Sequence, residues 1–413
     1  MPEQGREYTS VEICAGAGGQ ALGLHNAGFQ HRALIEFDRH ACDTLRANLG
    51  KLGGQENCQV HELDLKNFTK KAEPKEKQFN IASLGFKPGQ ITLLAGGVPC
   101  PPFSLAGKQL GRDDDRDLFP VMLDMVEALQ PRAVMIENVR GLLEPSHRFA
   151  EYREEIRRIL RRLGYVPSEW TLVEARNFGV PQLRPRAILI AICEKDAPYF
   201  PKKLPLGDSE AVVTVADALK KSMRQRVRAL GDEGEKIYRR WLEKAERGSV
   251  APTLVGGSKK HGGADLGPTR AKKAWELLGI DAHGVADEPL KDKERDLLSE
   301  RGIKLTVSQA AIIQGFPEDW KFAGKKTAAY RQVGNAFPPP VAETMGKAII
   351  EALRRADAGE ALSPIDKELF EAANTPIKLF ECSDLDGESS GNRKPSDATS
   401  EAVELDRTPA SVH

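Results

Sequence analysis

Cys100 is the residue of this 413-residue chain whose surroundings best suit covalent chemistry. It lies in Gly96-Gly97-Val98-Pro99-Cys100-Pro101-Pro102-Phe103-Ser104, directly after the apolar run 91–95, which predicts a buried strand. A thiol at a strand end, on a backbone that prolines restrict, suits nucleophilic attack on a bound substrate. The alternative is a buried structural thiol, because free cysteine is among the most buried residue types.

Three charged side chains could act beside such a nucleophile. Glu137 follows the apolar run 133–136, and a carboxyl next to a thiolate suggests an acid–nucleophile pair. In Gln182-Leu183-Arg184-Pro185-Arg186 the two arginines occupy alternate positions of an extended segment, so we expect them to point the same way. They could hold a phosphate, a carbonyl oxygen or Glu137. Alternatively, Glu137 caps a helix or pairs with Arg140, and the arginines form a surface pair.

A glycine-rich turn, Ala15-Gly16-Ala17-Gly18-Gly19, follows the first predicted strand and opens a helix. Its glycines let the backbone approach a ligand and present amide groups at the helix N-terminus. Glu36 ends the next strand, where it could accept hydrogen bonds from ribose, and Asp64 could accept from an adenine amino group. Alternatively, both are solvated loop carboxylates. Because neither G-x-G-x-x-G spacing nor a Walker lysine is present, S-adenosylmethionine is favoured over nicotinamide, flavin or ATP.

The elements that must position these residues alternate between short apolar runs and amphipathic stretches over residues 8–195. This alternation predicts the α/β class, with a doubly wound, mainly parallel sheet and ligands at the carboxyl ends of its strands. The predicted strands are 10–14, 33–37, 91–95 and 133–136, with a closing pair at 170–174 and 187–192; the predicted helices are 20–28, 41–48, 118–129 and 152–163.

The pattern changes after residue 195. Residues 196–300 are highly charged and predict a second, less regular domain, with a helix at 233–247 and a Gly/Lys-rich stretch at 254–270. Apolar patterning returns from Leu305, and 340–354 predicts a long amphipathic helix. The polar remainder, 357–413, carries a net charge of −8 against +8 for the rest of the chain. We expect this tail to be largely disordered, although 365–370 could form a short helix.

The amino-acid composition favours a soluble globular protein over a membrane or disulfide-rich one. At 40% hydrophobic and 29% charged residues, the chain is typical of soluble globular proteins. No apolar run approaches the ~18 residues that a membrane span needs, and the polar N-terminus lacks a signal region. The six cysteines are scattered without a CxxC pair, which favours a reducing cytosol over a zinc site or a disulfide framework. We therefore expect a cytoplasmic, nucleoid-associated protein without a metal.

Five motifs occur in one order along the chain. They are Ala15-Gly16-Ala17-Gly18-Gly19, Gly97-Val98-Pro99-Cys100-Pro101-Pro102-Phe103-Ser104, Glu137-Asn138-Val139, Gln182-x-Arg184-x-Arg186 and Gln332-Val333-Gly334-Asn335-Ala336. Together they closely resemble the DNA (cytosine-5)-methyltransferases, of the bacterial restriction-modification type. The resemblance covers about 8–195 and 303–356 and implies the Rossmann-like fold of S-adenosylmethionine-dependent methyltransferases, with a smaller irregular target-recognition domain.

The resemblance implies transfer of a methyl group from S-adenosylmethionine to C5 of a cytosine flipped out of duplex DNA. Cys100, as thiolate, would attack C6. Glu137 would be protonated or share a proton with N3, and a carboxyl that stays neutral near pH 7 needs burial. Arg186 would hold the cytosine O2 and orient Glu137, with Arg184 supporting the same pocket. Asn138 would brace the loop that carries Glu137.

For the cofactor, the resemblance implies contacts along the glycine-rich turn and from the returning C-terminal segment. The implied residues are Cys14, Gly16, Gly18 and Gly19 in the turn, Glu36 on the ribose, Phe37 against the adenine, Asp64 with Leu65 at its amino group, Pro99 and Leu118 at the methionine end, and Asn335 with Ala336 closing the site. Two positions depart from the usual pattern: Pro101 replaces a common glutamine, and Cys14 replaces the usual phenylalanine.

The resemblance also implies that different parts of the chain have different roles. Residues 1–195 and 323–356 would form the catalytic and cofactor-binding domain, 196–322 the target-recognition domain, and 357–413 an acidic tail. Double-stranded DNA would be the partner, and no membrane is expected. The candidate DNA contacts are Ser104, Lys108 and Gln109 in a loop closing over the flipped base, and Gly256, Gly257, Ser258, Lys259, Lys260 and Arg270 in the recognition domain. An ordinary solvated loop is the alternative for the latter set.

We further expect a monomer that protects host DNA from a cognate restriction endonuclease. A tRNA cytosine-5 methyltransferase is the nearest alternative, but it would lack the roughly hundred-residue variable region. The RNA family with a second catalytic cysteine needs a Thr-Cys pair, which is absent. A DNA-binding regulator without catalysis is disfavoured because Cys100, Glu137 and Arg186 are all present, and an oxidoreductase is disfavoured because no phosphate fingerprint occurs.

Overall fold

A computed structural model describes residues 7–54, 56–99, 117–256 and 264–362 of the chain. Cys100 and the tail beyond residue 362 therefore lie outside the described residues. No helix within the described ranges is long and apolar enough to cross a membrane.

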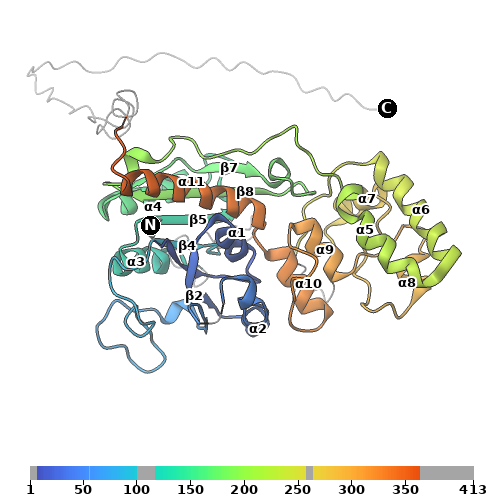
Figure 1. Ribbon diagram of the computed structural model, residues 1–413, viewed down its shortest axis with the longest axis horizontal. Coiled ribbons are helices and arrows are strands. Elements are labelled where there is room, and N and C mark those ends of the chain that lie inside the picture. The colour runs from blue at the N-terminus through green and yellow to red at the C-terminus, as the bar shows by residue number, and fades with distance from the viewer. Residues whose placement is uncertain (1–6, 55, 100–116, 257–263, 363–413) are drawn as a thin grey trace, which may run out of the picture. The chain divides into compact units, whose positions relative to one another are not determined.

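A single mixed sheet organises the part of the chain that carries the predicted site (Figure 1). Its strands are β1 (Thr9–Ile13), β2 (Gln30–Glu36), β3 (Gln59–Glu62), β4 (Leu93–Gly96), β5 (Ala133–Val139), β6 (Tyr165–Pro167), β7 (Thr171–Glu174) and β8 (Pro185–Cys193). They follow the order β3-β2-β1-β4-β5-β8-β6, and β7 also pairs with β8. The pairs from β3 to β5 are parallel, whereas β8 runs antiparallel to β5, β6 and β7.

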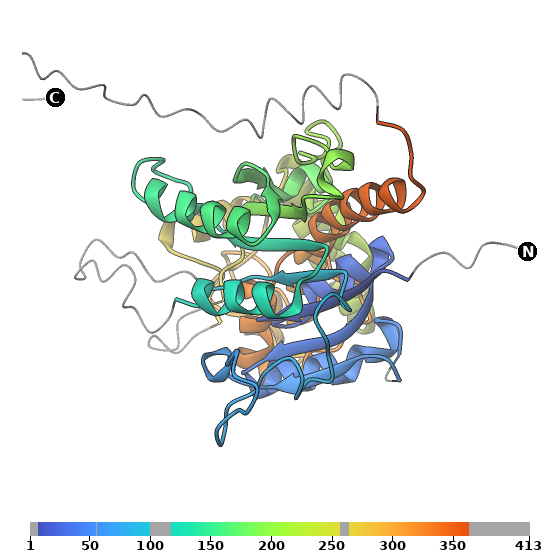
Figure 2. The ribbon, with the colours of Figure 1, turned by 90° about the vertical axis from the view of Figure 1, so that its left-hand side faces the viewer.

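Helices cover both faces of this sheet, which confirms the predicted doubly wound α/β class (Figures 1 and 2). The helices are α1 (Gly19–Ala27), α2 (Arg39–Asn48), α3 (Phe119–Leu129), α4 (Ala150–Arg162), α5 (Val215–Val227), α6 (Gly231–Arg247), α7 (Thr269–Leu277), α8 (Lys293–Leu297), α9 (Val307–Gln314), α10 (Lys326–Asn335) and α11 (Pro339–Asp357).

The strands alternate their side chains between two cores, as extended backbone requires. Along β2, Ala33 and Ile35 pack with the apolar side chains of α3 and α4. Leu34, between them, packs with Leu22 of α1 and Leu45 of α2 on the opposite face. The parallel pairing of β3, β2, β1, β4 and β5 places the carboxyl ends of these strands, and the site residues that follow them, at one edge of the sheet.

The C-terminal helix α11 packs against α1, although more than 300 residues separate them in sequence. Small residues allow this close approach: a Cβ on Gly23 would lie 2.3 Å from the carbonyl oxygen of Pro339, and one on Gly346 would lie 2.7 Å from the Cβ of Ala27. The predicted return of the C-terminal segment to the first sheet is therefore observed. The helix predicted at 340–354 is this one, extended by a few residues.

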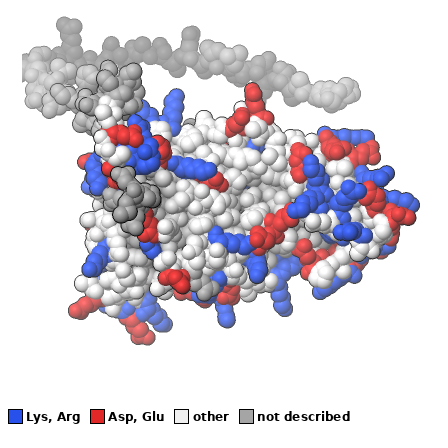
Figure 3. All heavy atoms as spheres, in the orientation of Figure 1, with Lys and Arg blue, Asp and Glu red and all other residues white. Residues whose placement is uncertain are grey.

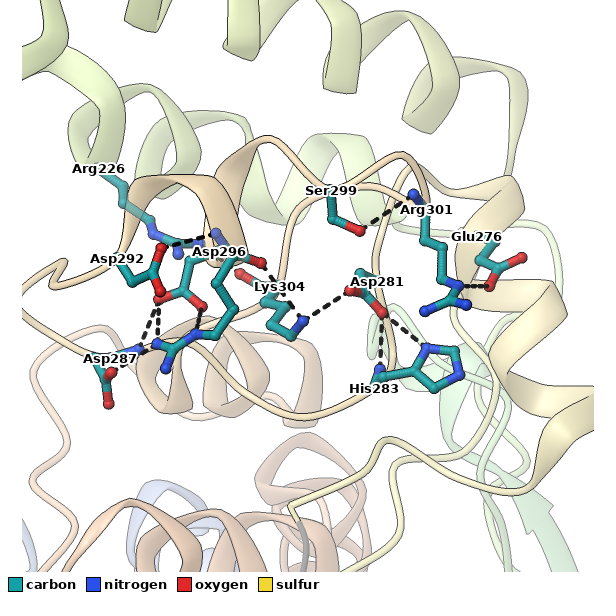
Figure 4. A network of polar contacts seen from close by, with 11 residues as sticks. Arg226, Glu276, Asp281, His283, Asp287, Asp292, Asp296, Ser299, Arg301 and Lys304 are labelled. Atoms are coloured by element: carbon teal, nitrogen blue, oxygen red, sulfur yellow. Dashed lines mark hydrogen bonds and ion pairs between the residues drawn. The ribbon is translucent and has the colours of Figure 1, made fainter.

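Residues between β8 and α10 form a mainly helical region, α5 to α9, of which only the helix now numbered α6 was predicted from its internal periodicity. Trp241 and Trp275 lie buried at its centre. A polar network joins its loops (Figure 4): the guanidinium of Arg295 contacts Asp287 and Asp296, and the ammonium group of Lys304 lies 2.8 Å from Asp281. Asp281 and Asp296 are buried, so these pairs stabilise the loops from within.

Candidate active site

A cavity opens at the carboxyl ends of β1, β2, β4 and β5, where the parallel arrangement predicts ligand binding. Its volume is about 420 Å³, within the range of small-molecule sites. The predicted cofactor residues that line it are Cys14, Gly16, Gly19, Glu36, Phe37, Asp64, Leu65, Pro99, Leu118, Asn335 and Ala336. Gly18 is the predicted residue that does not line it; instead it caps α1 with a left-handed backbone, φ 83°.

Glu36 is held at the cavity wall by backbone donors. The amides of Phe37 and Asp38 donate to Glu36 Oε1, each at 2.9 Å, and the amide of Gly16 donates to Oε2 at 2.8 Å. These three bonds fix a buried carboxylate at the end of β2 and tie it to the glycine-rich turn. Each carboxylate oxygen can accept further bonds, so Glu36 can still receive ribose hydroxyls.

Phe37 and Asp64 both line the cavity. Phe37 is 68% exposed, the state of an aromatic ring whose face a planar base could cover. Asp64 Oδ1 accepts from the amide of Lys66 at 3.0 Å, which orients the carboxylate. Cys14 also lines the cavity, in a left-handed conformation with φ 51°. Burial and the nearby carboxylates of Glu36 and Asp64 raise the pKa of its thiol, so Cys14 stays neutral.

Glu137 adds an acid to the lining of the cavity. It lies in β5 beside β4, with its Oε1 2.8 Å from Arg186 Nε. Burial raises the pKa of Glu137, although the charges of Arg186 and Arg184 and the hydrogen bond from Arg186 act in the opposite direction. A Cβ on Gly97 would lie 2.8 Å from Glu137 Oε2, so only glycine leaves this carboxyl room at the head of β4.

Asn138 joins the two strand ends that carry the predicted nucleophile and acid. Its Nδ2 donates to the carbonyl oxygen of Val98 at 2.8 Å, and its Oδ1 accepts from the amide of Val139. Asn138 is buried. It therefore braces the segment that leads into Cys100 as well as the one that carries Glu137.

Arg184 and Arg186 make different contacts, although both are close enough to influence the pKa of Glu137. Arg186 contacts Glu137 itself. Arg184 instead donates to the carbonyl oxygens of Leu254, Gly334 and Ala336, at 2.6, 2.7 and 2.9 Å. In the described structure Arg184 thus holds backbone segments together around the cavity, and a direct contact of Arg184 with substrate stays a prediction.

Most of the candidate DNA contacts fall outside the described residues, as does the nucleophile: Cys100, Ser104, Lys108, Gln109, Gly257, Ser258, Lys259 and Lys260. Arg270 is exposed at the start of α7. Gly256 is packed against the C-terminal segment, since a Cβ there would lie 2.2 Å from Asn335 Oδ1.

Among the lining residues that the motifs did not predict, two carry unpaired donors. The Nε2 of Gln20 and the Nε of Arg331 are buried and have no hydrogen-bond partner within the described chain, and both residues line the cavity. Gln20 directly follows the glycine-rich turn, and Arg331 lies four residues before Asn335, one helical turn away on the same face. Those spacings are the signals from which both could have been identified.

The charges of the cavity suit S-adenosylmethionine, a sulfonium with one carboxylate and one ammonium group. Four carboxyl groups line it, those of Glu36, Asp38, Asp64 and Glu137, whereas Arg331 is the one cation among the described lining residues. Acidic walls favour a ligand of net positive charge. The unpaired donors of Gln20 and Arg331 suit its carboxylate. No cluster of three or more potential metal ligands occurs in the described ranges.

Comparison with known proteins agrees with this geometry. The family model for C-5 cytosine-specific DNA methylase matches residues 8–351. The type II methyltransferase M.NaeI of Lentzea aerocolonigenes is 50% identical over 350 residues, covering 84% of this chain and 76% of the relative. M.NgoMIV of Neisseria gonorrhoeae is 43% identical, covering 84% and 99%. The S. pombe Dnmt2 methyltransferase shares the fold, with a TM-score of 0.52 at 20% identity, over 84% of this chain and 99% of that one.

The family match thus spans the cavity, the acid at its inner end and the returning segment that closes it. The chain belongs to the C-5 cytosine-specific DNA methylases and is a DNA (cytosine-5)-methyltransferase that depends on S-adenosylmethionine.

Proposed function

We propose that methylation of C5 proceeds through a covalent bond between Cys100 and C6 of a flipped cytosine, with Glu137 as the acid. The observation that carries this proposal is the buried Glu137 carboxyl, whose pKa is raised and which shares one cavity with the predicted cofactor residues. Asn138 supports it by bonding the carbonyl of Val98, two residues before Cys100.

The proposed reaction begins at C6 of the flipped cytosine. The Cys100 thiolate adds to C6, and Glu137 delivers its proton to N3 as negative charge develops on the ring. S-adenosylmethionine, when bound, supplies an activated methyl group on a sulfonium. As C5 bonds the methyl carbon, the bond from that carbon to sulfur breaks, and its electron pair leaves with neutral S-adenosylhomocysteine. The C5 proton then leaves to water, the electron pair expels Cys100 as thiolate, and the N3 proton returns to Glu137. Arg186, 2.8 Å from Glu137, orients the acid and is placed to hold the cytosine O2.

A covalent trap tests these steps. Duplex DNA containing 5-fluorocytosine, together with S-adenosylmethionine, should give an adduct that survives denaturing electrophoresis, because fluorine cannot leave C5 as the proton does. The Cys100→Ser variant should form no adduct. An adduct with that variant, or none with the wild-type protein while unmodified DNA is methylated, would contradict the proposed nucleophile.

We also propose the division into domains. Residues 1–195 with 323–356 carry the chemistry, and 196–322 read the DNA sequence. On the face shown in Figure 3, Lys and Arg side chains over α5 and α6 stand beside acids, and pairs such as Lys221–Glu318 and Arg239–Glu235 neutralise them. Paired charges cannot supply a continuous basic track, which supports assigning DNA contact to the segment after Gly256 and to Arg270.

The biological proposal is that a monomer marks specific sites in the host chromosome, in the nucleoid, and so protects them from a partner endonuclease. Bisulfite sequencing of DNA from cells expressing the protein would give the methylated sequence. Methylation at one short recurring sequence is expected, and scattered methylation without a common sequence would contradict the role.

A further inference from the structure

Residues 254–256 of the proposed recognition domain are bonded directly to the wall of the cofactor cavity. The contact involves a junction of seven residues. The junction comprises Gln182, Arg184, Leu254, Gly256, Gly334, Asn335 and Ala336. Asn335 and Ala336 line the cavity, and Gly256 is the last described residue before 257–263. The junction therefore joins a segment that we assign to DNA with one that we assign to the cofactor.

Arg184 is the centre of this junction. Its guanidinium is 1% exposed and donates from Nη1 to Leu254 O and from Nη2 to Gly334 O and Ala336 O. One cation thus bonds carbonyls from two chain segments that are about 80 residues apart in sequence. Hydrogen bonds from a charged donor are stronger than neutral ones, so neither segment can shift without straining its bond to the other.

Gln182 makes a second, parallel connection. Its Oε1 accepts from the amide of Leu254 at 3.1 Å, and its Nε2 donates to Gln314 Oε1 at 2.6 Å. Gln314 in turn donates to the carbonyl of Ala336. Gln182 and Gln314 are completely buried, so this route is also rigid and shielded from water.

Packing at Gly256 completes the connection. A Cβ on Gly334 would lie 2.5 Å from the amide nitrogen of Gly256, and a Cβ on Gly256 would lie 2.2 Å from Asn335 Oδ1. The backbone of Gly334 is therefore in direct contact with that of Gly256, and the Asn335 side chain packs against the same glycine. Close-packed contacts of this kind transmit small shifts because they adopt discrete arrangements.

We propose that Arg184 is a positioning residue that couples binding of DNA by the proposed recognition domain, 196–322, to binding of the cofactor at Asn335 and Ala336. The proposal rests on the proposed function of residues 196–322. DNA that draws residues 254–256 into place sets the position of Gly334 to Ala336 through Arg184. By linkage, the cofactor must then strengthen DNA binding by the same factor with which DNA strengthens cofactor binding.

The test measures that factor with S-adenosylhomocysteine, the unreactive product, titrated calorimetrically with and without a short duplex carrying the mapped methylation site. In the wild-type protein the duplex should tighten S-adenosylhomocysteine binding at least about fivefold, the lower end of usual coupling. Arg184→Met should reduce this ratio to near one. Arg184→Lys should retain an intermediate ratio, because an ammonium keeps the charge but lacks the planar fork of donors.

Arg226→Met is the matched control. Arg226 is another largely buried arginine that donates to a carbonyl, that of Lys304 at 2.6 Å, but it does not line the cavity. It should keep the wild-type ratio. If Arg184→Met does not fold, Gly256→Ala replaces it, because the added methyl must push Asn335 away; its ratio should also fall towards one.

A ratio of one in the wild-type protein overturns the inference. An unchanged ratio in the Arg184→Met variant also overturns it. The same holds for Gly256→Ala if that variant has to replace Arg184→Met. Failure of the proposed recognition role of residues 196–322 has a different signature, because Arg270→Ala would then leave the affinity for the duplex unchanged when no S-adenosylhomocysteine is present. If the protein methylates DNA but Arg184→Met leaves the ratio of S-adenosylhomocysteine affinities unchanged, the proposed coupling is wrong and the proposed function stands.

Discussion

The properties of Glu137 arise from two opposing influences at a single carboxyl. Burial disfavours its charged form and raises its pKa, whereas Arg186, 2.8 Å away, and Arg184 favour the charged form. Burial prevails, so the carboxyl keeps its proton to a higher pH than an exposed glutamate would. A general acid opposite a cytosine N3 requires that state.

Replacing Glu137 by Gln tests this acid. We expect methyl transfer in a single turnover to slow at least about 100-fold, because an amide can donate a hydrogen bond but cannot deliver the proton. The wild-type rate should fall as the pH rises through the raised pKa, since the deprotonated carboxyl is no longer an acid. This fall should be absent from the variant. Equal rates for the two proteins would remove the acid role.

Arg331 offers a second test at the scale of one residue. Arg331→Gln should weaken binding of S-adenosylhomocysteine about tenfold, because it removes the one cation that lines the described cavity. Binding of 5′-methylthioadenosine, which has no carboxylate, serves as the control and should hardly change. If both ligands weaken equally, Arg331 does not contact the carboxylate. Fluorescence or calorimetric titration gives both affinities.

At the scale of elements, periodicity identified the strands and helices around the cavity well. The parallel strands β1, β2, β4 and β5 and their helices were predicted because apolar runs of this kind have a single interpretation in an α/β chain. β6 was missed because a three-residue strand has no measurable period. The helices α5 and α7 were missed because charged residues interrupt their apolar pattern, and only tertiary packing shows which face is buried.

The contact between α1 and α11 can be tested with one methyl group. Gly23→Ala places a Cβ 2.3 Å from the carbonyl oxygen of Pro339 and 2.5 Å from the Cβ of Ala342, so the helices must separate. We expect the free energy of unfolding to fall by about 1–3 kcal/mol in urea titrations. Gly50→Ala, where a Cβ would meet no atom within 4 Å, should change it by less than about 0.5 kcal/mol. Equal effects would contradict this packing.

At the scale of the whole molecule, the motifs predicted which distant segments meet. Glu36, Glu137 and Asn335 were expected at one site, and all three line one cavity. The polar network of the helical region could not be predicted, because Asp281, Asp296 and Lys304 look like surface residues in a highly charged stretch. Only the fold shows that Asp281 and Asp296 are buried against cations.

Lys304→Met tests how far that network stabilises the protein. Burial alone would raise the pKa of Asp281, yet Lys304 and His283 lower it to about 2. Removing Lys304 should cost about 3–5 kcal/mol of unfolding free energy at pH 7, because a buried carboxylate loses its partner.

The lowered pKa of Asp281 also determines the direction in which stability changes with pH. The stabilisation from Asp281 is complete above about pH 4, its unfolded pKa, and is lost as the pH falls towards 2. The difference between wild type and Lys304→Met should therefore shrink over that window. A pH-independent difference in urea midpoints would contradict the assignment.

The central claim is that this chain methylates C5 of cytosine in DNA. The most direct measurement incubates the purified protein with duplex DNA and S-adenosylmethionine carrying a deuterated methyl group, and then identifies the modified nucleosides by mass spectrometry. We expect deuterated 5-methyldeoxycytidine from the wild-type protein and none from Cys100→Ser. Label in N4-methyldeoxycytidine or N6-methyldeoxyadenosine, or label only in added tRNA, would contradict it.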